Sequence, residues 1–129
     1  MLSRIKNFFL NKEAAIDKTD FSEKRTAPRF AVSIPTNYVH PQTNEVAYAH
    51  THDISDIGLG LVTNYELPTG TPIDLKLIMM DNGEEIRVKG QVLWSRLDQE
   101  NEFRSGIKLQ DCTIKAIPLT LRAIQANLQ

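Results

Sequence analysis

The sequence predicts a mainly β protein, built as one domain around a six-stranded antiparallel barrel with a helix after the last strand. Three observations lead to this fold class. Apolar and polar residues alternate through six segments between residues 30 and 109, which is the period of half-buried strands. Turn-forming residues separate these segments at short intervals, as in sandwiches and barrels. The last residues return to a helical period, and closing six strands into a barrel removes exposed strand edges from so small a protein.

The expected strands cover residues 30–38, 45–55, 58–63, 73–79, 86–94 and 103–109. Pro35 lies inside the first strand and indicates an edge position or a bulge there. Asp81-Asn82-Gly83 suits a type I′ hairpin turn between the fourth and fifth strands. Residues 97–101 read as a charged loop before the sixth strand. Trp94 continues the apolar face of the fifth strand, so we expect its side chain in the core.

The C-terminal segment has the pattern of an amphipathic helix. Proline is tolerated in the first position of a helix, so we expect the main helix to start at about Pro118, after a short turn near Thr113. Apolar residues at helical spacing share one face, namely Ile114, Ile117, Leu121, Ile124 and Leu128.

The N-terminal region divides into two parts. Residues 1–16 have a helix-forming composition, with Leu2, Ile5 and Phe9 at helical spacing. We favour a short helix that packs on the barrel or on another subunit. A peripheral membrane helix and a frayed tail are the alternatives. Residues 17–29 are polar and read as a linker or mobile loop. We therefore divide the chain into an N-terminal helical extension and linker at 1–20 and a domain at 21–129.

Composition limits the function classes. The chain has 129 residues and a net charge of −1, which argues against a general nucleic-acid binder, since that role needs a large basic excess. The single cysteine, Cys112, fits a reducing compartment. No apolar run approaches the ~20 residues that span a bilayer. We expect a cytoplasmic protein without a transmembrane segment.

Two short motifs carry the functional signal. Arg25 and Arg29 form R-x-x-x-R just before the first expected strand, and Asp53, Ser55 and Gly58 form D-x-S-x-x-G where the second strand meets the third. Arginine binds phosphate bidentately and matches the O6/N7 edge of guanine. A carboxylate accepts hydrogen bonds from guanine N1–H and N2–H₂, and a serine two residues on shares its strand face. Glycine permits close backbone approach or a positive φ.

These two motifs, in this order, resemble the signature of the PilZ domain family, the bacterial receptors for cyclic di-GMP. The stretches Gly90–Arg96 and Phe103–Leu109 look like the last two strands of the PilZ barrel. The resemblance covers roughly residues 23–128. It implies a six-stranded barrel without catalytic chemistry, whose arginine loop is flexible until it wraps over the nucleotide. It also implies control of motility, pili or exopolysaccharide, as in biofilm formation, through an effector protein.

The resemblance assigns the ligand to Arg25, Arg29, Asp53, Ser55 and Gly58, with Lys24 as an additional cation. From this extra charge we expect an intercalated dimer of cyclic di-GMP. No cofactor and no resident metal are expected.

Other functions remain open at this stage. The strongest alternative is a non-binding, PilZ-like protein-interaction adaptor in which the motif is vestigial. A metal-dependent enzyme is a weaker one, because His50 and His52 are spaced as two ligands on one strand face. A barrel for single-stranded nucleic acid ranks low, since it requires a basic groove with exposed aromatic residues.

Overall fold

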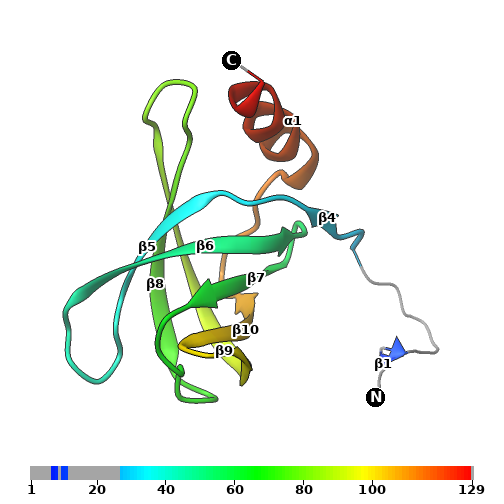
Figure 1. Ribbon diagram of the computed structural model, residues 1–129. Coiled ribbons are helices and arrows are strands. Elements are labelled where there is room, and N and C mark those ends of the chain that lie inside the picture. The colour runs from blue at the N-terminus through cyan, green and yellow to red at the C-terminus, as the bar shows by residue number, and fades with distance from the viewer. Residues whose placement is uncertain (1–6, 9, 12–26, 129) are drawn as a thin grey trace.

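Six antiparallel strands close into a barrel in the computed structural model, which describes residues 7–8, 10–11 and 27–128 (Figure 1). Around the barrel the strands follow the order β6-β5-β8-β9-β10-β7, and pairing of β7 with β6 closes the ring. This confirms the predicted fold class. The strands are β5 (Pro35–Val39), β6 (Val46–Ile54), β7 (Gly58–Thr63), β8 (Pro72–Ile78), β9 (Glu85–Gln99) and β10 (Glu102–Leu109).

The first expected strand is split in two. A short strand, β4 (Phe30–Ala31), pairs with the end of β6, whereas β5 pairs with its beginning. Between them, the Thr51 hydroxyl donates to the Val32 carbonyl and accepts from the Ile34 N–H, while the Thr51 N–H donates to the Ile34 carbonyl over 3.0 Å. A side chain thus supplies part of the pairing where the ladder is interrupted. Pro35 has no N–H to continue the ladder, which explains why the break falls here.

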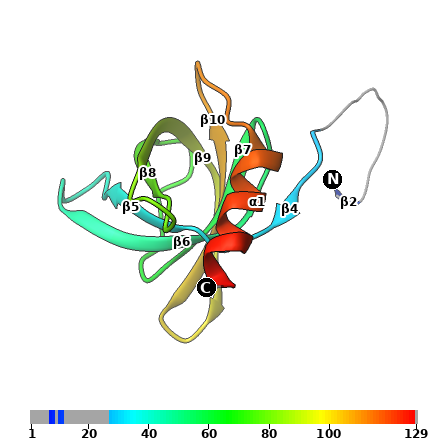
Figure 2. The same ribbon diagram turned by 90° about the horizontal axis from the view of Figure 1, so that it is seen from above.

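The core fills the barrel and the end that the C-terminal helix covers. Most of its largest fully buried side chains come from alternate positions of the expected strands, which confirms the period-two pattern there. Leu67, in a loop, and Thr51 and Ile54, three residues apart on β6, are exceptions. The C-terminal helix, α1 (Ala116–Asn127), adds Ala116, Leu119 and Ala123 to the same cluster. Figure 2 shows α1 lying across one end of the barrel, between β8 and β4.

Two loop expectations were wrong. Residues 97–99 continue β9, and Gln99 still pairs with Glu102, so the turn is confined to residues 100 and 101. Asn101 has a φ of 60°, a left-handed conformation that asparagine tolerates. The hairpin after β8 is longer than a two-residue type I′ turn. Gly83 N–H donates to the Met79 carbonyl over 2.7 Å, with Gly83 at a φ of 77°.

Helix α1 begins two residues earlier than expected, at Ala116. Pro118 is then its third residue, where the N–H has no partner within the helix, so the missing donor costs nothing. Lys115 occupies the N-cap without a side-chain hydrogen bond. Instead, the Asp56 carboxylate accepts the Ala116 N–H over 3.0 Å, and the Asp56 carbonyl accepts the Ile114 N–H over 3.0 Å. A residue sixty positions away thus caps the helix.

Helix α1 is not simply apolar toward the barrel and polar toward solvent. The face toward the barrel carries Ala116, Leu119, Thr120 and Ala123. On one flank, Arg122 forms ion pairs with Asp81 and Glu84 of the β8–β9 hairpin, each at 2.9 Å. Of the apolar face expected from the sequence, Ile114 is buried, but the other four side chains point outward.

The N-terminal extension is described at four residues. Asn7–Phe8 (β1) pairs with Leu10–Asn11 (β2), so these four are extended in place of the expected helix. The remainder of the expected extension lies outside the described residues. Within the described part of the chain, no helix is long and apolar enough to cross a membrane.

Candidate functional site

The D-x-S-x-x-G motif forms the tight turn that joins β6 to β7. The Ser55 N–H donates to the Gly58 carbonyl over 2.8 Å. The Ser55 hydroxyl accepts the N–H groups of Ile57 and Gly58 over 3.3 and 3.1 Å, and donates to the Gly58 carbonyl. With 1% of its surface exposed, Ser55 is buried in this turn. Its role in the described geometry is to hold the turn closed, and contact of its hydroxyl with a ligand stays a prediction.

Gly58 is required by close packing. A Cβ built on it would lie 2.7 Å from the carbonyl oxygen of Ile107 on β10, a distance that side chains do not tolerate. Gly58 is not among the residues with positive φ. Of the two reasons expected from the sequence, close backbone approach is therefore the one that applies.

Asp53 and Arg29 meet on the outer face of the barrel. Pairing of Ala31 with Asp53 in the β4–β6 ladder brings Arg29, two residues earlier, beside the carboxylate. Arg29 donates to Asp53 Oδ1 over 2.6 Å, and the Gly60 N–H donates to the same oxygen over 3.1 Å. The second oxygen lies 3.4 Å from His52 Nδ1. The structure thus joins one residue of the arginine motif to the other motif.

A row of four residues crosses four strands from Asp53. Asp53 on β6 pairs with Gly60 on β7, Gly60 with Gly106 on β10, and Gly106 with Trp94 on β9. A Cβ on Gly60 would lie 3.0 Å from Asp53 Oδ1, and one on Gly106 would lie 2.3 Å from Trp94 Nε1. The Asp53 carboxylate therefore lies over Gly60 and the Trp94 indole over Gly106, so the two groups approach the glycine pair from opposite ends of the row. We call these four residues the glycine row.

The expectation that Trp94 belongs to the core was wrong, since 42% of its surface is exposed. Gly106 pairs with Trp94 and Ile107 with Val92, so Leu93 is an extra residue, a β-bulge. The bulge moves every residue after it to the opposite face of the strand. Alternation in the sequence carried no sign of this shift.

The indole face also carries a cation. The Arg96 guanidinium lies 5.0 Å from the Trp94 ring centroid, within the range of a cation–π contact. Arg96 pairs across the ladder with Arg104, which binds Asp98 at 3.2 Å. Sequence reasoning missed Gly60, Trp94, Gly106 and Arg96 as site residues, although a tryptophan followed two residues later by an arginine was visible as a signal. The row thus has a carboxylate at one end and an aromatic ring with cations at the other.

Two of the predicted ligand residues, Lys24 and Arg25, lie outside the described residues. His50 and His52, weighed as metal ligands, belong to no group of three metal-binding side chains within residues 27–128.

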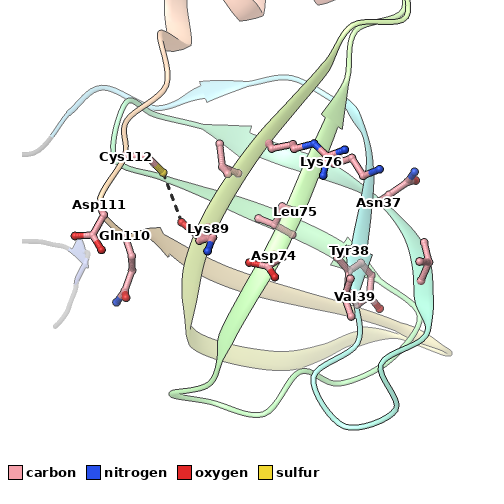
Figure 3. A pocket seen from close by; sticks show the side chains of 13 residues that line it. Asn37, Tyr38, Val39, Asp74, Leu75, Lys76, Lys89, Gln110, Asp111 and Cys112 are labelled. Atoms are coloured by element: carbon pink, nitrogen blue, oxygen red, sulfur yellow. Dashed lines mark hydrogen bonds between the residues drawn. The ribbon is translucent and has the colours of Figure 1, made fainter.

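A surface cavity of about 440 Å³ lies on other strands, β5, β8 and the first half of β9 (Figure 3). Lys76, Lys89, Asp74 and Asp111 give it mixed charge. Tyr38 contributes to its lining, and burial, together with nearby Tyr65, raises the pKa of its hydroxyl. The cavity shares no residue with the glycine row, so it is separate from the motif site.

Comparisons with known proteins identify a matching family and solved structures of similar fold. The family model of the PilZ domain matches residues 23–124. The structure is similar to the inhibitor of motility MotI/DgrA of Bacillus subtilis, with a TM-score of 0.61 and 13% identity over 82% of this chain. The match covers 52% of that protein, so this chain spans about half its length. It is also similar to the PilZ domain of YcgR from Escherichia coli, solved with cyclic di-GMP, with a TM-score of 0.56 and 12% identity. That match covers 82% of this chain and 93% of the other. None of the curated protein sequences is significantly similar to this chain.

Proposed function

The chain belongs to the PilZ domain family, and on this premise we propose that it is a receptor for cyclic di-GMP, a regulatory protein that relays the nucleotide level to a partner. The observation that carries the proposal is the ion pair of Arg29 with Asp53 at the end of the glycine row. It joins the two signature motifs on one open surface.

Asp53 is suited to hold a guanine edge. Its carboxylate accepts two hydrogen bonds already and is 24% exposed, so lone pairs remain for guanine N1–H and N2–H₂. Gly60, next to it, presents backbone without a side chain, and a flat base can lie close to the sheet there. Hydrogen bonds to a charged group contribute ~1.5–3 kcal/mol each.

Arg29 is placed to exchange partners when the nucleotide arrives. Its side chain is 53% exposed, and an exposed ion pair contributes only ~0–1 kcal/mol. A bidentate contact with phosphate is stronger, so transfer of the guanidinium from Asp53 to a phosphate is favourable. That exchange frees the carboxylate for the base.

Trp94 and Arg96 extend the proposed site to the other end of the glycine row. Stacking of a base on an aromatic side chain contributes ~1–3 kcal/mol. A micromolar site requires ~8 kcal/mol in total, which two guanine hydrogen bonds, phosphate contacts and one stacked base supply together.

Closure of the arginine loop is the proposed signal. Lys24 and Arg25 precede Arg29, and binding of phosphate by all three draws the linker over the site. Limited tryptic cleavage between Lys18 and Arg29 then slows when cyclic di-GMP is added. We also propose that this cluster of cations favours an intercalated dimer of the nucleotide, in a cytoplasmic protein that acts on motility, pili or exopolysaccharide through an effector.

The test is calorimetric titration of cyclic di-GMP into the protein, with GTP as the ligand control. Arg25→Ala/Arg29→Ala should abolish binding. A matched variant, Arg87→Ala/Lys89→Ala, removes two cations from the first half of β9 and should bind normally. Two nucleotides per chain support the intercalated dimer, and one per chain rejects it. If cyclic di-GMP gives neither heat nor thermal stabilisation, the receptor proposal fails, and a non-binding adaptor is the function left.

A further inference from the structure

Helix α1 presents an apolar stripe to solvent. Ile117, Leu121, Ile124 and Leu128 are 57%, 56%, 45% and 81% exposed, and their spacing of four, three and four residues places them in one line. We call these four the α1 stripe. The same spacing is that of a helix packed against another apolar segment.

The stripe lies on the flank of α1 away from the β8–β9 hairpin. At 100° per residue, its mean direction is about 130° around the helix from Arg122, which binds that hairpin. Strand β4 contacts α1, and in Figures 1 and 2 it lies on the side opposite to the hairpin. Strand β4, through which the chain enters the barrel, therefore lies beside the helix that carries the stripe.

We propose that the α1 stripe is the docking surface for the N-terminal segment of the same chain, residues 1–16, and that nucleotide in the motif site favours the docked arrangement. The second half of this proposal rests on the proposed function. Residues 1–16 carry apolar side chains at helical spacing, Leu2, Ile5 and Phe9, together with Phe8 and Leu10. Phe8 and Leu10 lie in the β1–β2 pair in the structure, so docking of this segment as a helix requires that pair to open.

Chain length permits this contact. Residues 17–26 span up to about 33 Å when extended, whereas a helix of the length of α1 is about 18 Å long. The linker contains Arg25 and leads into Arg29, so phosphate binding by these residues fixes its path next to α1. One event thus orders the linker and brings the segment to the stripe.

The size of the stripe favours a tethered occupant over a second copy. Four side chains exposed to this extent present on the order of 400 Å² of mostly apolar surface, whereas a stable dimer buries about 800 Å² per partner. A segment on a short linker has an effective concentration in the millimolar range, so a small contact suffices.

Charge argues against a lipid surface. Interfacial helices carry lysine and arginine beside their apolar face. Pro118, Gln125 and Asn127 flank the stripe here, and Arg122 is already paired with two carboxylates.

Hydrogen exchange of residues 1–16, read by mass spectrometry in the full chain, tests the proposal. With saturating cyclic di-GMP, exchange of this segment should slow by about ten-fold or more. Leu121→Ser/Ile124→Ser should restore fast exchange without changing the barrel. Val46→Ser/Tyr48→Ser, which alters exposed apolar residues on β6, should keep the protection. Leu2→Ser/Ile5→Ser should also lose the protection, because it removes apolar side chains from the docking segment instead of the stripe.

Each other outcome decides against the proposal. Equal exchange in the wild type and in Leu121→Ser/Ile124→Ser, with and without nucleotide, rules out docking. Protection that grows with protein concentration assigns the stripe to a second copy, and protection that requires anionic vesicles assigns it to a membrane. Calorimetry on the same samples separates the two proposals. If the nucleotide binds but exchange of residues 1–16 does not slow, the docking proposal is refuted and the receptor proposal is not. Absent binding refutes the receptor, and docking is then judged from the nucleotide-free exchange of the same variants.

Discussion

Replacement of Gly106 by alanine tests the glycine row directly. The new Cβ would lie 2.3 Å from Trp94 Nε1 and 2.6 Å from Cε2, where ordinary contacts are 3.4–4 Å. The indole must move by about 1 Å or more, since the strand backbone cannot yield as easily as an exposed side chain. Trp94 is 42% exposed, so it can swing outward while the barrel stays folded.

The expected effect on binding follows from the lost stacking. If a guanine stacks on Trp94, displacement of the ring costs ~1–3 kcal/mol, which weakens cyclic di-GMP binding by about 5- to 150-fold. Stability should change by less than about 1 kcal/mol, because alanine is less costly than glycine in a strand. Trp94 is the single tryptophan, so its fluorescence should shift in the free variant and respond less to nucleotide.

A double-mutant cycle with Trp94→Ala identifies the cause. Trp94→Ala alone should weaken binding to the same extent, and Gly106→Ala/Trp94→Ala should be no weaker than either. If Gly106→Ala binds like the wild type, or if the two losses add, the indole over Gly106 is not part of the nucleotide site and the reasoning fails.

Three further predictions concern single contacts. Asp56→Ala should lower the free energy of unfolding by ~1–2 kcal/mol in urea, and Asp56→Asn by less, because α1 loses the carboxylate that caps it; no change would show that the cap is dispensable. Arg29→Ala should alter stability by less than ~1 kcal/mol yet weaken cyclic di-GMP binding about ten-fold or more; unfolding with unchanged affinity would reverse these roles. The Arg122 guanidinium lowers the pKa of Asp81, so this contact stabilises the fold above the ordinary aspartate pKa of about 4. The stabilisation is lost as pH falls through the lowered pKa. Arg122→Ala should lack this loss in an acid unfolding curve, and curves identical to those of the wild type would contradict the prediction.

The sequence was sufficient for the fold class because inward-facing residues recur at every second position in most barrel strands, although all six residues of β7 are buried. Prediction from the sequence failed where a backbone feature moves side chains to the other face of a strand without any change in composition. The bulge at Leu93 is such a case, since Val92 and Trp94 read as one apolar face and lie on opposite faces. The break at residues 32–34 is another, because it depends on a hydroxyl from Thr51 on a neighbouring strand.

The candidate site was partly predictable for the same reason. Asp53 and Arg29 could be identified by residue type and spacing, because they belong to two motifs that occur together and in order. Gly60 and Gly106 could not, since their importance lies in a register that joins four strands. Ser55 was identified for a hydroxyl facing a ligand, yet in the structure that hydroxyl closes the turn.

Asp56, one of the unspecified positions of the D-x-S-x-x-G motif, has a structural role of its own. Asp56 lies three residues after Asp53, in the turn that Ser55 and Gly58 lock, and it holds the first N–H of α1. A turn closed by four hydrogen bonds transmits a displacement better than a flexible loop, because its backbone has no slack to absorb it. If Asp53 shifts when it binds a guanine, as proposed above, this turn connects that shift to the start of α1. The helix that carries the exposed stripe is thus anchored by the same six residues that carry the nucleotide motif.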